Sequence, residues 1–91
     1  MGSWRTAKFR KLYDKLDPAT QALVDAAYES YKRDPKLVNF EQKGRLQGVP
    51  HFGARINENW RALAFQTEGE TFWYWVGLHT DYDRILKGMG K

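Results

Sequence analysis

The hydrophobic period of the chain changes once, and this change constrains the fold more than any other feature. Before Pro35 the apolar residues recur at helical spacing, and from Phe52 onward they alternate with polar residues. A period of 3.6 is typical of amphipathic helices, and a period of two is typical of half-buried strands. The sequence therefore predicts helices first and a small antiparallel sheet second, which is an α+β fold in a single domain over residues 1–91.

The helical part is expected to contain two helices. The first spans Thr6–Leu16, and one face of it carries Phe9, Leu12, Tyr13 and Leu16. Asp17-Pro18 then begins a second helix, since aspartate caps helices and proline is tolerated at the first helical position. This helix is expected over Pro18–Lys32, before Asp34-Pro35 ends it, and its inward residues are Ala19, Leu23, Ala26, Ala27 and Tyr31. The short link predicts an antiparallel helical hairpin.

The second part is expected to begin with an extended piece at Val38–Phe40 and a basic loop from Gly44 to Pro50. Three strands follow, at Phe52–Ile56, Trp60–Gln66 and Thr71–Val76. Because the turns between them are short, neighbouring strands must be antiparallel. A helical turn over Tyr82–Leu86 closes the fold, and residues 1–5 and 88–91 are expected to fray.

The third of these strands is aromatic on both faces. Trp73 and Trp75 are expected to share the face turned away from the two helices. The preferred explanation is that another helix or the C-terminal tail covers them, because large aromatic side chains are rarely left in water. The alternative is a groove for a partner or for stacked bases.

Charge and composition limit the classes of function. The net charge is +4, and residues 1–16 carry five basic side chains against one acidic side chain, which permits nucleic-acid or acidic protein partners. The chain has no cysteine, so it has neither a disulfide nor a thiolate nucleophile. No apolar run approaches the roughly 20 residues that span a bilayer, so we expect a cytoplasmic protein. No histidine and carboxylates have metal-ligand spacing, so we predict no metal and no cofactor.

Two motifs in the second part resemble the RelE/ParE toxin superfamily. The first is an Arg–turn–Arg hairpin, in which Arg55 ends one strand and Trp60-Arg61 begins the next. The second is the closing pattern W-x-G-x-H-x-x-Y-D over residues 75–83. With the helical hairpin, the resemblance extends from about Phe9 to Leu86. The superfamily usually opens with a strand, which Trp4–Ala7 leaves minimal or absent here.

The resemblance implies the toxin of a type II toxin–antitoxin system, and within it a ribosome-dependent endoribonuclease that cleaves mRNA through the 2′-hydroxyl of the substrate. In such cleavage, arginine neutralises the phosphate and histidine transfers a proton near neutral pH. The catalytic residues that the resemblance and this chemistry imply are His79, Arg61, Tyr82 and Asp83. The RNA-binding residues that we expect are Lys43, Arg45, Arg55 and His51.

Two other functions fit the same resemblance. One is a ParE-like inhibitor that binds DNA gyrase without catalysis, and the other is an interaction module that has lost its activity. Thr80 stands where many members carry arginine and favours these two, whereas His79 and Tyr82 favour the nuclease. Each function implies a cognate antitoxin, with an acidic and partly disordered segment that folds on binding. The nuclease also requires mRNA on the ribosome, and either a homodimer or a hetero-oligomer with the antitoxin is compatible with the sequence.

Overall fold

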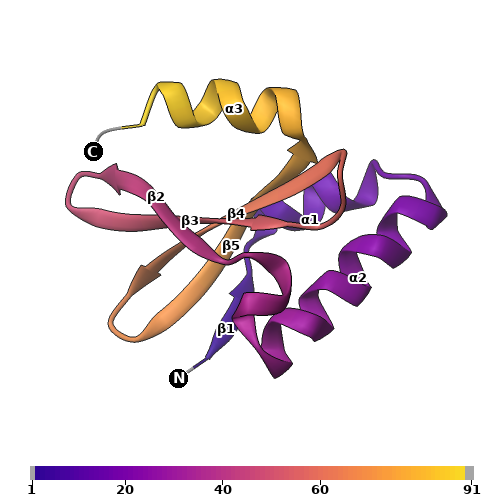
Figure 1. Cartoon of the computed structure of the whole chain (residues 1–91), viewed down its shortest axis with the longest axis horizontal. Helices are drawn as coiled ribbons and strands as arrows, with labels where there is room; N and C mark the ends of the chain where they lie inside the picture. Colours follow the sequence, from indigo (N-terminus) through magenta and orange to yellow (C-terminus); the bar gives the residue numbers. More distant parts are fainter. Residues whose placement is uncertain (1, 90–91) are drawn as a thin grey trace.

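The centre of the fold is a five-stranded sheet with strand order β1-β5-β4-β3-β2 (Figure 1). The computed structural model describes residues 2–89. Along the chain the elements are β1 (Ser3–Arg5), α1 (Ala7–Asp14), α2 (Pro18–Arg33), the 3-10 helix η1 (Pro35–Val38), β2 (Glu41–Leu46), β3 (Val49–Arg55), β4 (Trp60–Thr67), β5 (Glu70–Leu78) and α3 (His79–Lys87). The predicted α+β class is confirmed.

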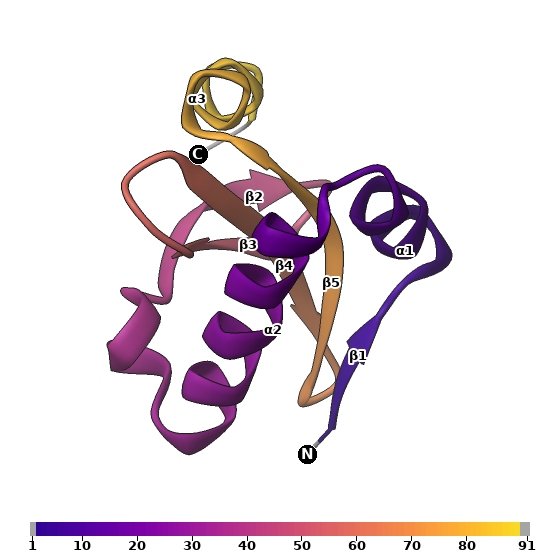
Figure 2. The ribbon, with the colours of Figure 1, turned by 90° about the vertical axis from the view of Figure 1, so that its right-hand side faces the viewer.

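The two N-terminal helices begin close to where the sequence predicts. Thr6 Oγ1 accepts a hydrogen bond from the Phe9 amide at 3.2 Å, and Asp17 Oδ1 accepts one from the Thr20 amide at 3.2 Å. Each cap satisfies an amide that the first helical turn leaves without a partner. Figure 2 shows α1 almost end-on and α2 from the side, so the two helices cross steeply instead of lying antiparallel as expected.

The buried face of α2 is rotated from the predicted one. Ala27 and Tyr31 pack against the core as expected, but three residues predicted to be inside are exposed, namely Ala19, Leu23 and Ala26. Val24 is buried in their place. Tyr28 and Tyr31 set this orientation, since both present their rings edge-on to Trp73, at centroid distances of 6.4 and 5.0 Å. The larger aromatic contact outweighs the burial of small alanines.

The segment between helices and strands also differs from the prediction. Residues 35–38 form η1 and not an extended piece, because Asp34 caps them and Asn39 leaves the turn in the left-handed conformation, with φ 50°. The expected loop from Gly44 to Pro50 is a hairpin of β2 and β3. Its turn, Gln47-Gly48, has φ values of 51° and 81°. Positive φ at both central residues is typical of the two-residue turns that join antiparallel strands, and Gly48 therefore indicates a tight turn and not a long loop.

The first strand is minimal but present. Ser3–Arg5, which we expected to fray, pairs in parallel with residues 71–73 of β5, so the sheet is mixed and not wholly antiparallel. Ser3 also links the strand to the helical layer, because its Oγ accepts from Trp73 Nε1 at 3.1 Å and lies 3.1 Å from the Tyr28 hydroxyl. Three residues are too few to show an alternation of apolar and polar side chains, so hydrophobic periodicity does not predict this strand.

The C-terminal helix α3 is longer than the predicted turn and begins at His79. It lies across the sheet on the side opposite α2 (Figures 1 and 2). Tyr82 and Met89 are buried, and the amides of Gly88 and Met89 close the last turn, so the expected fraying does not begin at residue 88. The same expectation for residues 1, 90 and 91 lies outside the described residues. Between residues 2 and 89, no helix is long and apolar enough to cross a membrane.

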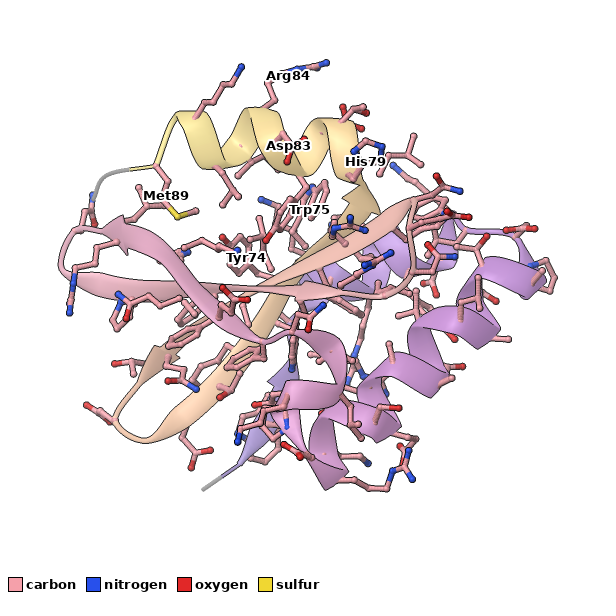
Figure 3. The ribbon with its side chains drawn as sticks, viewed as in Figure 1. Tyr74, Trp75, His79, Asp83, Arg84 and Met89 are labelled. Atoms are coloured by element: carbon pink, nitrogen blue, oxygen red, sulfur yellow. The ribbon has the colours of Figure 1, made fainter. Side chains whose placement is uncertain are left out.

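A β-bulge in β5 separates the two tryptophans of that strand. Leu63 pairs with Trp75 whereas Ala64 pairs with Trp73, which leaves Tyr74 as the extra residue. An extra residue breaks the alternation of faces. Trp73 is therefore buried among the helices, while Trp75 lies beneath α3 (Figure 3). The prediction that both share one face is wrong because it assumed an unbroken strand.

The two faces of the sheet are covered by different helices and carry different residues. The main core lies on the face covered by the N-terminal helices and contains Phe9, Val24, Val38, Ala54, Ala62, Ala64, Trp73 and Val76. Because side chains alternate along a strand, the remaining positions point to the other face. We call it the α3 face, and it carries His51, Gly53 and Arg55 of β3 with Arg61, Leu63 and Phe65 of β4. The candidate site lies on this face.

Candidate functional site

An open cleft of about 190 Å³ lies on the α3 face. It brings together four predicted site residues, Lys43, Arg55, Arg61 and Tyr82, and the rest of its lining is Asn39, Glu41, Gly53 and Ala54. Three cations therefore face one carboxylate, which lies 3.7 Å from the Lys43 ammonium. This excess of positive charge makes the cleft suited to an anion.

Arg55 and Arg61 lie directly opposite each other on β3 and β4. Opposed residues of antiparallel strands have Cβ atoms about 5 Å apart and share a face, so like charges there destabilise the free protein. Among residues 2–89, no carboxylate lies within salt-bridge distance of either guanidinium. A phosphate between the two would compensate both charges, and guanidinium groups bind phosphate with paired hydrogen bonds.

The Arg61 guanidinium is held by the turn that precedes it. Its Nη1 donates to the Asn57 carbonyl and, at 3.0 Å, to the Trp60 carbonyl. Asn57 fixes the turn in its own right, because its Oδ1 accepts from the amides of Asn59 and Trp60 at 2.9 Å each. The other guanidinium nitrogens make no hydrogen bond to the described residues, so they can bind a ligand while Nη1 keeps the side chain in place.

Tyr82 closes the cleft from α3, and Gly53 makes room for it. A Cβ on Gly53 would lie 1.8 Å from the Tyr82 hydroxyl oxygen, so only glycine allows this approach. Burial raises the pKa of Tyr82, the Asp83 and Glu41 carboxylates raise it further, and the Arg61 charge opposes them. The hydroxyl is therefore protonated at neutral pH, and it can donate a hydrogen bond to a bound anion.

His79 and Asp83 lie beside the cleft but do not line it. His79 is the first residue of α3 and not, as expected, the end of the closing strand. Its Nδ1 lies 3.9 Å from Asp83 Oδ2, one helical turn further on, and the imidazole is about half exposed (Figure 3). The His79 amide donates to the Asn59 carbonyl at 2.8 Å. His79 and Arg61 are thus both anchored on the β3–β4 turn.

His51 also lies outside the cleft, within an aromatic cluster. It is 7% exposed, and its Nδ1 lies 2.9 Å from the Tyr74 hydroxyl oxygen. Burial lowers the pKa of His51 and raises the pKa of Tyr74 to about 12, so both side chains are neutral near pH 7. The neutral imidazole can accept a hydrogen bond from the Tyr74 hydroxyl. The structure does not bring His51 to the arginines.

The other predicted residues divide between the cleft and the surface. Lys43 is the extra residue of a β-bulge in β2, which turns its side chain into the cleft. Arg45 lies further along β2, and its Nη1 donates to the Gly48 carbonyl at 3.2 Å, away from the cleft lining. Thr80 is exposed in the first turn of α3.

Sequence reasoning missed Asn39, Glu41 and Gly53. Gly53 carried a signal, because a glycine inside a strand often marks the close approach of another group. The left-handed conformation of Asn39 is common for asparagine and gave no such signal. Glu41 could not be assigned to the cleft, because the sequence predicts a loop from Gly44 onward and does not predict the strand β2.

The fold of the chain is similar to that of chains in two solved complexes of RelE with RelB. One is in the archaeal RelE–RelB complex from Pyrococcus horikoshii OT3, with a TM-score of 0.63, 9% identity, and coverage of 84% of this chain and 91% of that chain. Another is in the toxin–antitoxin complex RelBE2 from Mycobacterium tuberculosis, with a TM-score of 0.64, 22% identity, and coverage of 85% and 88%. No family model and no curated protein matches the sequence.

These similarities define the class of fold. The chain has the RelE-like toxin fold over most of its length, as the sequence motifs predicted. The opening strand that the superfamily usually has is also present, as β1.

Proposed function

We propose that this chain is the toxin of a type II toxin–antitoxin system and that it is a metal-independent endoribonuclease acting on mRNA at the ribosome. The observation that carries this proposal is the opposed pair of Arg55 and Arg61 in an open cleft of a RelE-like fold. Two uncompensated guanidinium groups at this spacing favour a phosphate ligand, and RNA supplies one at every nucleotide.

The proposed reaction uses the 2′-hydroxyl of the substrate as nucleophile on the adjacent phosphorus. The O2′–P bond forms while the bond from phosphorus to the 5′-oxygen breaks. Arg55 and Arg61 neutralise the charge that builds on the phosphate oxygens. The Tyr82 hydroxyl orients the phosphate by donating a hydrogen bond, because its raised pKa keeps it protonated at neutral pH.

His79 is the proposed proton-transfer group. Its imidazole is accessible, and Asp83 Oδ2 lies 3.9 Å from its Nδ1, where the carboxylate can orient the ring. The ring takes the proton of the 2′-hydroxyl as the O2′–P bond forms, and the resulting imidazolium gives this proton to the leaving 5′-oxygen as the P–O5′ bond breaks. Since His79 lies beside the cleft, the substrate would bridge from the arginines to the start of α3.

The proposed protein partner is a cognate antitoxin. Both similar structures are complexes of RelE with RelB. In this chain the cleft carries three cations, so an acidic segment of an antitoxin would be attracted to it and would exclude RNA. We propose that neutralisation occurs in this way.

Induced expression in a bacterial host, with mapping of transcript ends, tests the function. Wild type is expected to produce new mRNA ends linked to codons, and the double variant Arg55→Ala/Arg61→Ala is expected to produce none. Arg84→Ala is the matched control, because Arg84 is exposed on α3 and pairs with Asp81 at 3.6 Å, outside the cleft. Growth arrest with intact mRNA and broken DNA would support gyrase inhibition instead. No toxicity from folded protein would support an inactive interaction module.

A further inference from the structure

One rung of the sheet carries an aromatic ring from each of four neighbouring strands. Phe65 of β4 pairs with His51 of β3 and with Phe72 of β5, and Phe72 pairs with Trp4 of β1. Paired residues point to the same face of a sheet. Since the neighbours of Phe65 and Phe72 in the chain, Ala64 and Trp73, lie in the helical core, these four rings lie on the α3 face. We call them the aromatic rung.

The rung becomes more exposed toward β1. His51 is buried, Phe65 and Phe72 are partly exposed, and Trp4 is 56% exposed. The rings of Phe65 and Phe72 lie nearly parallel, at 21° and 5.2 Å between centroids. The indole of Trp4 donates to Glu70 at 3.1 Å, which fixes the ring at the edge of the sheet. Because Phe65 and Phe72 stack on each other, the free aromatic surface of the row lies at its Trp4 end, and fixed rings there offer it at little cost in side-chain entropy.

The aromatic rung and the arginine pair share two strands. His51 precedes Arg55 by four residues on β3, and Phe65 follows Arg61 by four residues on β4. Four residues of strand span about 13 Å, so the rung lies about 13 Å from the arginines on the same face, and Tyr82 of α3 lies over Gly53 between them. Lys8 of α1 adds a cation beside it, with its ammonium 5.8 Å from the centre of the neighbouring Tyr74 ring.

We propose that the aromatic rung is a base-stacking surface for single-stranded RNA whose phosphates bind the arginine pair. Cationic groups that follow a backbone beside aromatic rings are the combination by which proteins hold single strands. Unstacked bases have two flat faces, and Phe72 and Trp4, at the exposed end of the rung, offer matching ones, while Phe65 is stacked against Phe72 from within. Charge complementarity favours RNA over a protein partner here, because the cations of the arginine pair and Lys8 outnumber the Glu70 carboxylate beside Trp4. The inference rests on the proposed function for its substrate class, but it does not require cleavage.

Binding of a fluorescent single-stranded RNA of eight nucleotides tests this inference, with 2′-O-methyl groups that prevent cleavage. We expect Phe72→Leu and Trp4→Leu each to weaken binding about fivefold or more, as the loss of one stacked base does. Phe52→Leu is the matched control, since Phe52 is in a similar stacked pair with Phe40, at 4.8 Å and 2°, on the helical face. Trp4 is exposed, so its variant will fold even if Phe72→Leu does not.

The salt dependence separates stacking from charge. Arg55→Ala should lower the slope of log affinity against log salt by about one, because it removes one phosphate contact. The rung variants should leave that slope unchanged. Equal affinities for wild type, both rung variants and Phe52→Leu would overturn the inference even if the chain cleaves mRNA. Rung-dependent RNA binding without any cleavage on the ribosome would support the inference and overturn the proposed nuclease. If the rung variants bind RNA as wild type does but no longer bind a peptide partner, the inference is overturned and the rung is a protein interface.

Discussion

Replacing Gly53 by alanine tests whether Tyr82 holds α3 on the sheet. A Cβ at Gly53 would lie 1.8 Å from the Tyr82 hydroxyl oxygen and 2.8 Å from the ring carbon Cζ. Since atoms cannot approach this closely, either the ring must leave or β3 must move. Tyr82 is 6% exposed, so its displacement exposes a buried side chain that packs between α3 and the sheet. We expect a loss of about 1–3 kcal/mol in the free energy of unfolding, as for other overpacked cores.

Urea unfolding followed by tryptophan fluorescence measures this loss. Gly88→Ala is the matched control, because the nearest atom to its new Cβ would be the Ile85 carbonyl oxygen, at an ordinary contact distance of 3.7 Å. The same Gly53→Ala change should cost much less in a Tyr82→Leu background, where the ring is absent. If the costs of the two substitutions simply add, to within about 0.5 kcal/mol, the steric reasoning is refuted.

Three other perturbations test the charges and the core. Arg55→Ala removes repulsion from Arg61, so it should leave the free energy of unfolding of the free protein unchanged or raise it by about 0.2–1 kcal/mol. The gain should be largest at low salt. A loss above about 1 kcal/mol in urea unfolding would contradict this. The pKa of His51 is lowered in the fold, so the unfolded chain binds more protons and stability should fall as pH drops below about 6.5. Melting temperatures at pH 7.5 and 5.5 measure that fall in stability, and His51→Gln should reduce it. An equal fall in the variant would contradict the claim that His51 causes it. Trp73→Ala should cost about 3–5 kcal/mol and Trp75→Ala less, since Trp73 is buried in the helical core and Trp75 is only partly buried; equal costs in urea unfolding would contradict this difference in burial.

The parts of the fold that sequence predicted are those governed by local chemistry. Asp17 caps α2 as its position before Pro18 indicated, and the β4–β5 turn forms where Gly69 permits a positive φ of 77°. The bulge at Tyr74 could not be predicted, because it depends on how β5 pairs with β4. The steep crossing of α1 and α2 depends on packing against the sheet in the same way.

The candidate site was predicted only in part, for a related reason. Arg55, Arg61 and Tyr82 meet in the cleft because the hairpin register and the placement of α3 bring them together. The register follows from the short turn, so the arginine pair could be expected. His51, which the sequence predicts to bind RNA, is instead buried by β3 within an aromatic cluster whose members come from three strands. Contacts between distant strands leave no pattern in a single sequence.

Cleavage of mRNA on purified ribosomes tests the central claim most directly. Ribosomes carrying a defined mRNA would be incubated with wild type and with Arg55→Ala/Arg61→Ala, and the products would be mapped. Wild type should cut the mRNA, and the double variant should do so about 100-fold or more slowly, as when groups that stabilise transition-state charge are removed. No cut should occur when the nucleotide 5′ of the scissile phosphate lacks its 2′-hydroxyl. An absence of cleavage by folded wild type, or equal cleavage by the double variant, would contradict the claim.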